Sequence, residues 1–102
     1  MTRRSFEESV RRALDSLPPQ IVAQLRNVAV VVEDEDPDDP DLFGLFREEP
    51  YLPATIAIYR QPLAESFPDP DELEREIRIT VLHELGHFFG LEEDELGDLG
   101  YA

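Results

Sequence analysis

His83-Glu84-Leu85-Gly86-His87 is an H-E-x-x-H pattern that contains both histidines of the 102-residue chain. On a helix, residues i and i+4 lie one turn apart on the same face, so the two imidazoles can bind one tetrahedral metal ion, most suitably Zn²⁺. Glu84 lies about 100° further around the helix, where its carboxylate can reach a water on the metal rather than the metal itself. The pattern therefore predicts a zinc hydrolase site with Glu84 as general base.

The sequence around the motif predicts one long helix from Pro70 to Phe89. Asp69 suits the N-cap, Pro70 the first helical position and Glu72 the third position of a capping box. Gly90 suits the left-handed residue that ends many helices. The C-terminal half of this helix is largely apolar, and one narrow polar line runs through it: Glu76, Thr80, His83, Glu84 and His87. Buried polar groups need partners, and a metal ion would be a partner for this line.

A third ligand is needed if the zinc is to keep an open fourth position. The chain has no cysteine and no third histidine, so a carboxylate or a tyrosine must supply it. Glu93 completes H-E-x-x-H-x-x-G-x-x-E, the metzincin spacing with Glu in place of the last His. A helix end at Gly90 would turn the chain back towards the metal. Three neighbouring acids are alternatives, of which Asp94 is the nearest rival: Glu92, Asp94 and Glu95.

Two simpler interpretations stand beside this one. H-E-x-x-H also occurs by chance on helices that bind no metal, where hydrogen bonds satisfy the histidines. The four acids from Glu92 to Glu95 also suit the start of a short helix over residues 92–97, where negative charge is favourable.

The order of segments in the chain adds a resemblance to a known family. An N-terminal helix carries apolar residues from Phe6 to Leu17 and is followed by Val28–Glu33, Leu42–Phe46, Ile56–Arg60, the H-E-x-x-H helix and a C-terminal Leu99-Gly100-Tyr101. In motif and order, over nearly its whole length, the chain resembles the mini-zincins, a bacterial family of very short proteins with a zincin-like fold. The resemblance implies a zinc peptidase scaffold whose substrates are generally unknown. The family usually carries Asp where this chain has Glu93, which is one carbon longer.

The expected fold class is α+β, with residues 1–102 forming a single zincin-like domain. A small sheet of two or three strands packs on the active-site helix, and N-terminal helices complete this minimal zincin-like fold. The expected elements are a helix over Phe6–Ser16 that starts with a Ser5–Glu8 capping box, a short helix over Pro19–Leu25, strands at Val28–Glu33 and Thr55–Arg60, a loop over Asp34–Pro53 with a turn at Leu42–Phe46, and a connection over Pro62–Pro68.

The charge of the chain favours some partners over others. Its net charge is −15, with 24 acidic and nine basic residues, so nucleic acid is a poor partner. A cationic peptide or protein is easier to attract, although such a surface can also serve only solubility. Seven acids and two prolines between Glu33 and Asp41 indicate an exposed loop. No apolar run is long enough to cross a membrane, and the expected location is the cytoplasm. The sequence does not define an oligomeric state.

The sequence predicts hydrolysis of a peptide bond by a metal-activated water. Thr55–Arg60 is expected either to offer a sheet edge to an extended substrate or to serve as a plain structural strand. By elimination, three residues are candidates for stabilising the oxyanion: Tyr59, Arg60 and Tyr101. One rival interpretation is a zinc-binding regulatory or protein-interaction module with little or no hydrolysis. The other is a domain that binds through its acidic surface, with an incidental motif.

Overall fold

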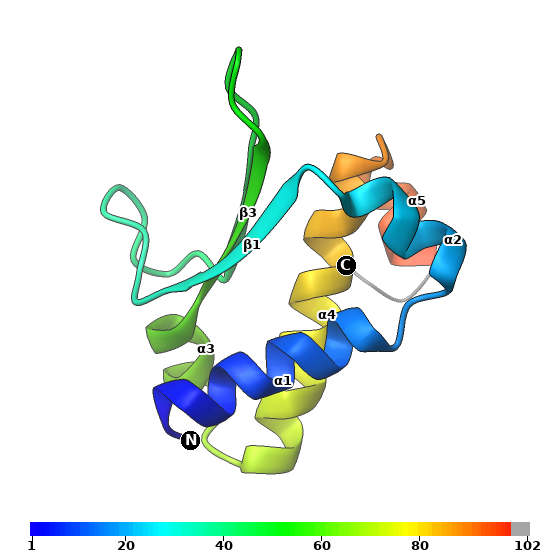
Figure 1. Cartoon of the computed structure of the whole chain (residues 1–102). Coiled ribbons are helices and arrows are strands. Elements are labelled where there is room, and N and C mark those ends of the chain that lie inside the picture. Colours follow the sequence, from blue (N-terminus) through cyan, green and yellow to red (C-terminus); the bar gives the residue numbers. More distant parts are fainter. Residues whose placement is uncertain (99–102) are drawn as a thin grey trace.

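The computed structural model describes residues 1–98, which fold into helices packed on a small sheet (Figure 1). The helices are α1 (Arg3–Asp15), α2 (Pro19–Val22), α3 (Arg60–Ser66), α4 (Pro70–Phe88) and α5 (Glu93–Asp98), with a 3-10 helix η1 (Ala23–Leu25) after α2. The strands are β1 (Val28–Glu33), β2 (Gly44–Arg47) and β3 (Ala54–Tyr59). The expected α+β class is confirmed. The predicted C-terminal segment Leu99-Gly100-Tyr101 lies outside the described residues.

The three strands are arranged in the order β1-β3-β2, with β3 parallel to β1 and antiparallel to β2. The strand expected at Thr55–Arg60 is therefore the central strand, and both of its edges are paired. The prediction that it offers an edge to a substrate is wrong. The edge beside α4 belongs instead to β2, where the sequence predicted only a turn within a long loop. A four-residue strand is too short to give a clear alternation of apolar and polar residues.

The core lies between the sheet and the two longest helices, α1 and α4, which pack side by side (Figure 1). Ile56 and Ile58 of β3 point towards these helices, and Ala57 and Tyr59 point to the other face, because side chains alternate along a strand. The helices and the connecting α3 contribute a contiguous set of buried apolar side chains: Phe6, Val10, Ala13, Leu63, Leu73, Ile77, Val81 and Leu85. This packing fixes one face of α4 against the sheet and so sets the orientation of the motif.

Two local predictions differ from the structure. Helix α1 starts earlier than expected, because Thr2 rather than Ser5 is its N-cap and accepts the Ser5 N–H at 3.1 Å. The connection expected over Pro62–Pro68 contains helix α3. Pro62 stands in the first turn of this helix, where a missing N–H costs no intrahelical hydrogen bond.

Candidate metal centre

Helix α4 begins and ends as its sequence predicts. The Asp69 carboxylate accepts the Glu72 N–H at 3.0 Å, which satisfies one of the free donors of the first turn. At the other end Gly90 has a φ of 82°, its N–H donates to the His87 carbonyl at 3.0 Å, and the Leu91 N–H donates to the Gly86 carbonyl at 2.9 Å. These two bonds form a Schellman motif, which reverses the chain direction directly after the motif helix.

The reversal brings a carboxylate to both histidines. The Glu93 Oε1 atom lies 2.9 Å from His87 Nε2 and 3.3 Å from His83 Nε2. The two Nε2 atoms are 3.0 Å apart. Glu84 completes a group with the two histidines, in which one ligand-type atom of each residue lies within 4.8 Å of the others. We call these four residues the histidine cluster: His83, Glu84, His87 and Glu93.

The donor atoms of the histidine cluster fit a zinc ion. With Zn–N and Zn–O bonds of about 2.0 to 2.1 Å, two ligands of a tetrahedral ion lie roughly 3.3 Å apart. The three separations among the His83, His87 and Glu93 donor atoms are 3.0, 3.3 and 2.9 Å, close to that value. Two imidazoles and one carboxylate are also the donor set of a zinc site that leaves one position open.

The rival acids beside Glu93 make other contacts. The Asp94 carboxylate accepts the N–H of Glu95 at 3.0 Å. The Glu95 carboxylate in turn accepts the N–H of Glu92 at 3.2 Å. Both therefore satisfy donors at the start of α5, as the simpler helix-start interpretation predicted. Glu93 is the acid of this segment whose carboxylate contacts both imidazoles.

The comparison with protein families agrees with this geometry. The sequence pattern of the zincin-like metallopeptidases matches residues 25–101, from η1 to beyond α5. The chain belongs to this family. The match includes the whole sheet, the motif helix and the segment with Glu93, and it confirms the expected resemblance to a short zincin. No curated protein matches the chain. Among the described residues, no helix has the length and apolarity that crossing a membrane requires.

Glu84 differs from the other members of the histidine cluster in its burial, since only 8% of it is exposed. This burial raises the pKa of the Glu84 carboxyl, and the two neighbouring histidines and a hydrogen bond from the Phe46 backbone N–H oppose the rise. The Tyr59 N–H donates to the Phe43 carbonyl at 2.8 Å, so by the alternation of an antiparallel ladder the Phe46 N–H points to the open edge of β2. The edge strand thus holds the Glu84 carboxylate in place.

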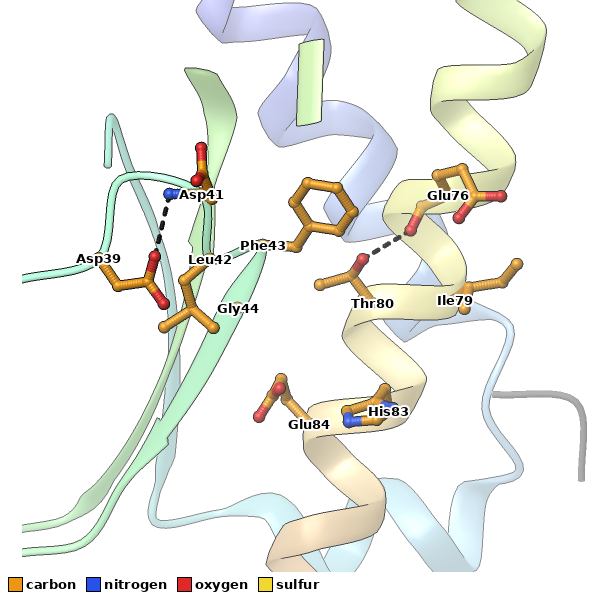
Figure 2. A pocket seen from close by; sticks show the side chains of 10 residues that line it. All are labelled: Asp39, Asp41, Leu42, Phe43, Gly44, Glu76, Ile79, Thr80, His83 and Glu84. Carbon is orange, nitrogen blue, oxygen red and sulfur yellow. Dashed lines mark hydrogen bonds between the residues drawn. The ribbon is translucent and has the colours of Figure 1, made fainter. Parts of the chain in front are cut away.

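Gly44 explains how β2 comes so close to the motif helix (Figure 2). A Cβ atom at this position would lie 2.9 Å from the Thr80 Cγ2 atom and 3.1 Å from the Glu84 Cγ atom. The strand therefore needs a glycine opposite α4. Sequence reasoning missed Gly44 and Phe46 as residues of the site, although the glycine inside an apolar run, Leu42-Phe43-Gly44-Leu45-Phe46, was a signal of close backbone approach.

A second polar cluster lies on the other face of the sheet. The Tyr59 hydroxyl donates to Asp36 Oδ2 at 3.0 Å and accepts from Arg47 Nη2 at 2.8 Å. Arg47 also pairs with Glu33 at 2.9 Å, and Asp36 Oδ1 accepts the N–H groups of Asp38 and Asp39. We call these four residues the far-side cluster: Glu33, Asp36, Arg47 and Tyr59. The sequence indicated an exposed acidic loop, and Asp36 departs from that prediction because only 8% of it is exposed.

These contacts remove two of the three oxyanion candidates. Tyr59 is fully buried on the face of the sheet that points away from α4, and its hydroxyl is already engaged. The Arg60 guanidinium forms an ion pair with Asp34 at 2.8 Å. The polar groups of both side chains are therefore engaged by acids outside the histidine cluster. The third candidate, Tyr101, lies outside the described residues.

Proposed function

We propose that this chain is a zinc-dependent peptidase in which His83, His87 and Glu93 hold the metal and Glu84 is the general base. The observation that carries the proposal is the convergence of three ligand-type atoms within 2.9 to 3.3 Å of one another beside a buried carboxylate. Membership of the zincin-like metallopeptidase family supports the same chemistry.

The proposed mechanism gives each residue one task. His83, His87 and Glu93 would hold Zn²⁺, which would supply Lewis acidity to activate a water and polarise the scissile carbonyl. Glu84 accepts the proton of the attacking water and returns it to the leaving amine. The position of the Glu84 carboxylate suits this task, because it is buried beside both histidines and within reach of a water at the proposed metal position. Helix α4 carries both histidines and Glu84, so the backbone fixes the base beside the residues that would hold the metal.

The open edge of β2 is the proposed alignment site for the substrate. The outward-facing backbone groups left for a peptide are the N–H and carbonyl of Gly44 and the carbonyl of Phe46, opposite the part of α4 that carries Glu84, because the Phe46 N–H already donates to Glu84. An extended peptide that adds to this edge would make backbone hydrogen bonds and pass the histidine cluster. This role replaces the one expected for Thr55–Arg60.

The experiment that tests the proposal compares wild type with Glu84→Gln. Both proteins are dialysed against trace zinc, analysed for metal content and incubated with a mixture of denatured proteins and synthetic peptides, and mass spectrometry detects new termini. We expect about one zinc per chain in both proteins and new termini only with the wild type. His83→Ala is the matched control for the metal, since it should lose both zinc and cleavage.

Each other outcome supports a different function. Zinc binding without cleavage by the wild type would favour the zinc-binding regulatory or interaction module. The absence of zinc from the wild type would reject the metallopeptidase and leave an acidic interaction domain. Equal cleavage by wild type and Glu84→Gln would remove Glu84 as the general base.

A further inference from the structure

A cavity of about 450 Å³ lies beside the proposed general base, between α4 and the segment that enters β2 (Figure 2). His83 and Glu84 line it together with apolar side chains of Leu42, Phe43 and Ile79. Its size falls within the range of roughly 300 to 1,000 Å³ that ligand pockets occupy. Because Glu84 lines the cavity, a substrate side chain bound there would belong to a residue close to the reacting bond.

Three acids also line this cavity: Asp39 and Asp41 on the segment before β2, and Glu76 on α4 (Figure 2). The chain contains no lysine, and all nine of its basic residues are arginines. Within residues 1–98, the arginines that form ion pairs do so with other acids, and none pairs with these three. Within residues 1–98 these acids therefore form no ion pair, although Asp39 Oδ1 accepts the Asp41 N–H at 3.2 Å.

We infer that this cavity binds the side chain of an arginine or lysine that lies next to the scissile bond of the substrate. Such a side chain has an apolar stem and a cationic head, so it can cover apolar surface while its charge contacts carboxylates. Leu42, Phe43 and Ile79 would contact the stem, and the acids on either side of the cavity, Asp39 and Asp41 on the loop and Glu76 on α4, would attract the charged head. This inference rests on the proposed peptidase function, because only Glu84 and His83 relate the cavity to a reacting bond.

The first arm of the test measures binding independently of cleavage. Zinc-loaded, ¹⁵N-labelled Glu84→Gln protein is titrated with alanine-rich hexapeptides that carry arginine, norleucine or glutamate at one central position. We expect the arginine peptide to bind about tenfold more tightly than the norleucine peptide, with the largest shifts at the amides of Gly44 and Thr80, and the glutamate peptide to bind least. Equal dissociation constants for arginine and norleucine would overturn the inference.

The second arm separates the cavity from the general negative charge of the chain. The variant Asp39→Asn/Asp41→Asn/Glu76→Gln removes three charges from the cavity. A control variant, Glu48→Gln/Glu49→Gln/Glu65→Gln, removes three exposed charges that do not line it. We expect the preference for arginine to be lost in the first variant and kept in the control. An equal loss in both would show that only the overall charge attracts the peptide.

The third arm measures cleavage of the same peptides by wild-type protein. A preference for arginine in binding without any cleavage would keep the cavity as a site for basic side chains and reject the proposed peptidase function. Cleavage of all peptides without a preference in binding would keep the peptidase and reject the inference. Cleavage faster for the arginine peptide, with the difference abolished only in the cavity variant, supports both.

Discussion

The two polar clusters of the molecule lie on opposite faces of the sheet and differ in how their charges are balanced. In the far-side cluster each carboxylate accepts a hydrogen bond from another side chain of the protein. Arg47 donates to Glu33, and the Tyr59 hydroxyl donates to Asp36. In the histidine cluster, two imidazole nitrogens and a carboxylate oxygen converge on one point. Neutral imidazoles and a carboxylate bind metal ions, whereas a carboxylate matched by arginine and tyrosine donors is a stable structural unit.

The strand β2 contacts both clusters. Its first residue, Gly44, lies against Thr80 and Glu84 of α4, and its last residue, Arg47, joins the far-side cluster. A short edge strand thus places the proposed general base while its other end is held by a network that needs no metal. We therefore expect variants of the histidine cluster to change metal binding and cleavage, and variants of the far-side cluster to change stability alone.

The largest effect is expected for His87→Ala. Removing a residue that only hydrogen-bonds to a metal ligand typically weakens metal binding by about 10- to 100-fold. Removing a ligand itself should therefore weaken zinc binding by more than about 100-fold. Zinc at about 100 times its dissociation constant should stabilise the wild type by about 2.7 kcal/mol, which raises the melting temperature by about 10 to 20 °C. Thermal unfolding with and without zinc measures this shift, and a full shift in His87→Ala would contradict the histidine cluster as the zinc site.

Glu93→Gln should have a smaller effect on zinc affinity. Glutamine keeps an oxygen ligand but lacks the charge, and the Glu93 side chain is 66% exposed, so we expect zinc binding to weaken by about 10- to 100-fold. Asp94→Asn is the matched control, because it neutralises the next residue, whose carboxylate contacts the Glu95 N–H. Competition with a zinc chelator gives both affinities. A larger loss in Asp94→Asn than in Glu93→Gln would reassign the third ligand.

Gly44→Ala should destabilise the protein by about 1 to 3 kcal/mol, because the new methyl group overlaps the Thr80 Cγ2 atom. Thr80→Ser removes that atom but keeps the hydroxyl, which donates to the Glu76 carbonyl at 2.8 Å. The double variant should therefore recover part of the loss, with the contact to Glu84 remaining. Urea unfolding of the two single variants and the double variant gives the coupling energy. Additive losses would show that β2 moves away from α4 instead of pressing on it.

The residues that the sequence could predict are those whose signal is local. The ends of α4, the left-handed Gly90 and the spacing from His83 to Glu93 all follow from short patterns, and the structure brings these side chains together. Strand β2 is defined by pairing with β3, which comes later in the chain, so a four-residue segment in an acidic loop gave no reliable pattern.

The far-side cluster was missed for the same reason. Asp36 lies among acids that are mostly exposed, and only its contact with Tyr59, 23 residues away in sequence, distinguishes it. The cavity beside Glu84 also combines the loop before β2 with α4, so its acids could not be related to the motif before the two were placed together.

The smallest effect on the proposed site is expected for Asp36→Asn, which should change stability and leave zinc affinity unchanged at pH 7. The pKa of Asp36 is lowered, and the largest cause is the hydrogen bond from the Asp38 N–H. The Tyr59 hydroxyl, the Asp39 N–H and nearby Arg47 also lower it, while burial opposes them. A lowered pKa in the folded state stabilises the protein above the ordinary value of about 3.9, and this contribution is lost as the pH falls through the folded-state pKa. Wild type should therefore be more stable than the variant at pH 7, and the difference should shrink in stronger acid.

Urea unfolding from pH 7 to pH 3 measures this difference in the free energy of unfolding between wild type and Asp36→Asn. The titration of the other acids affects both proteins equally and therefore cancels. A difference that stays constant to pH 3, or a loss of zinc affinity at pH 7, would show that the two clusters do not act separately.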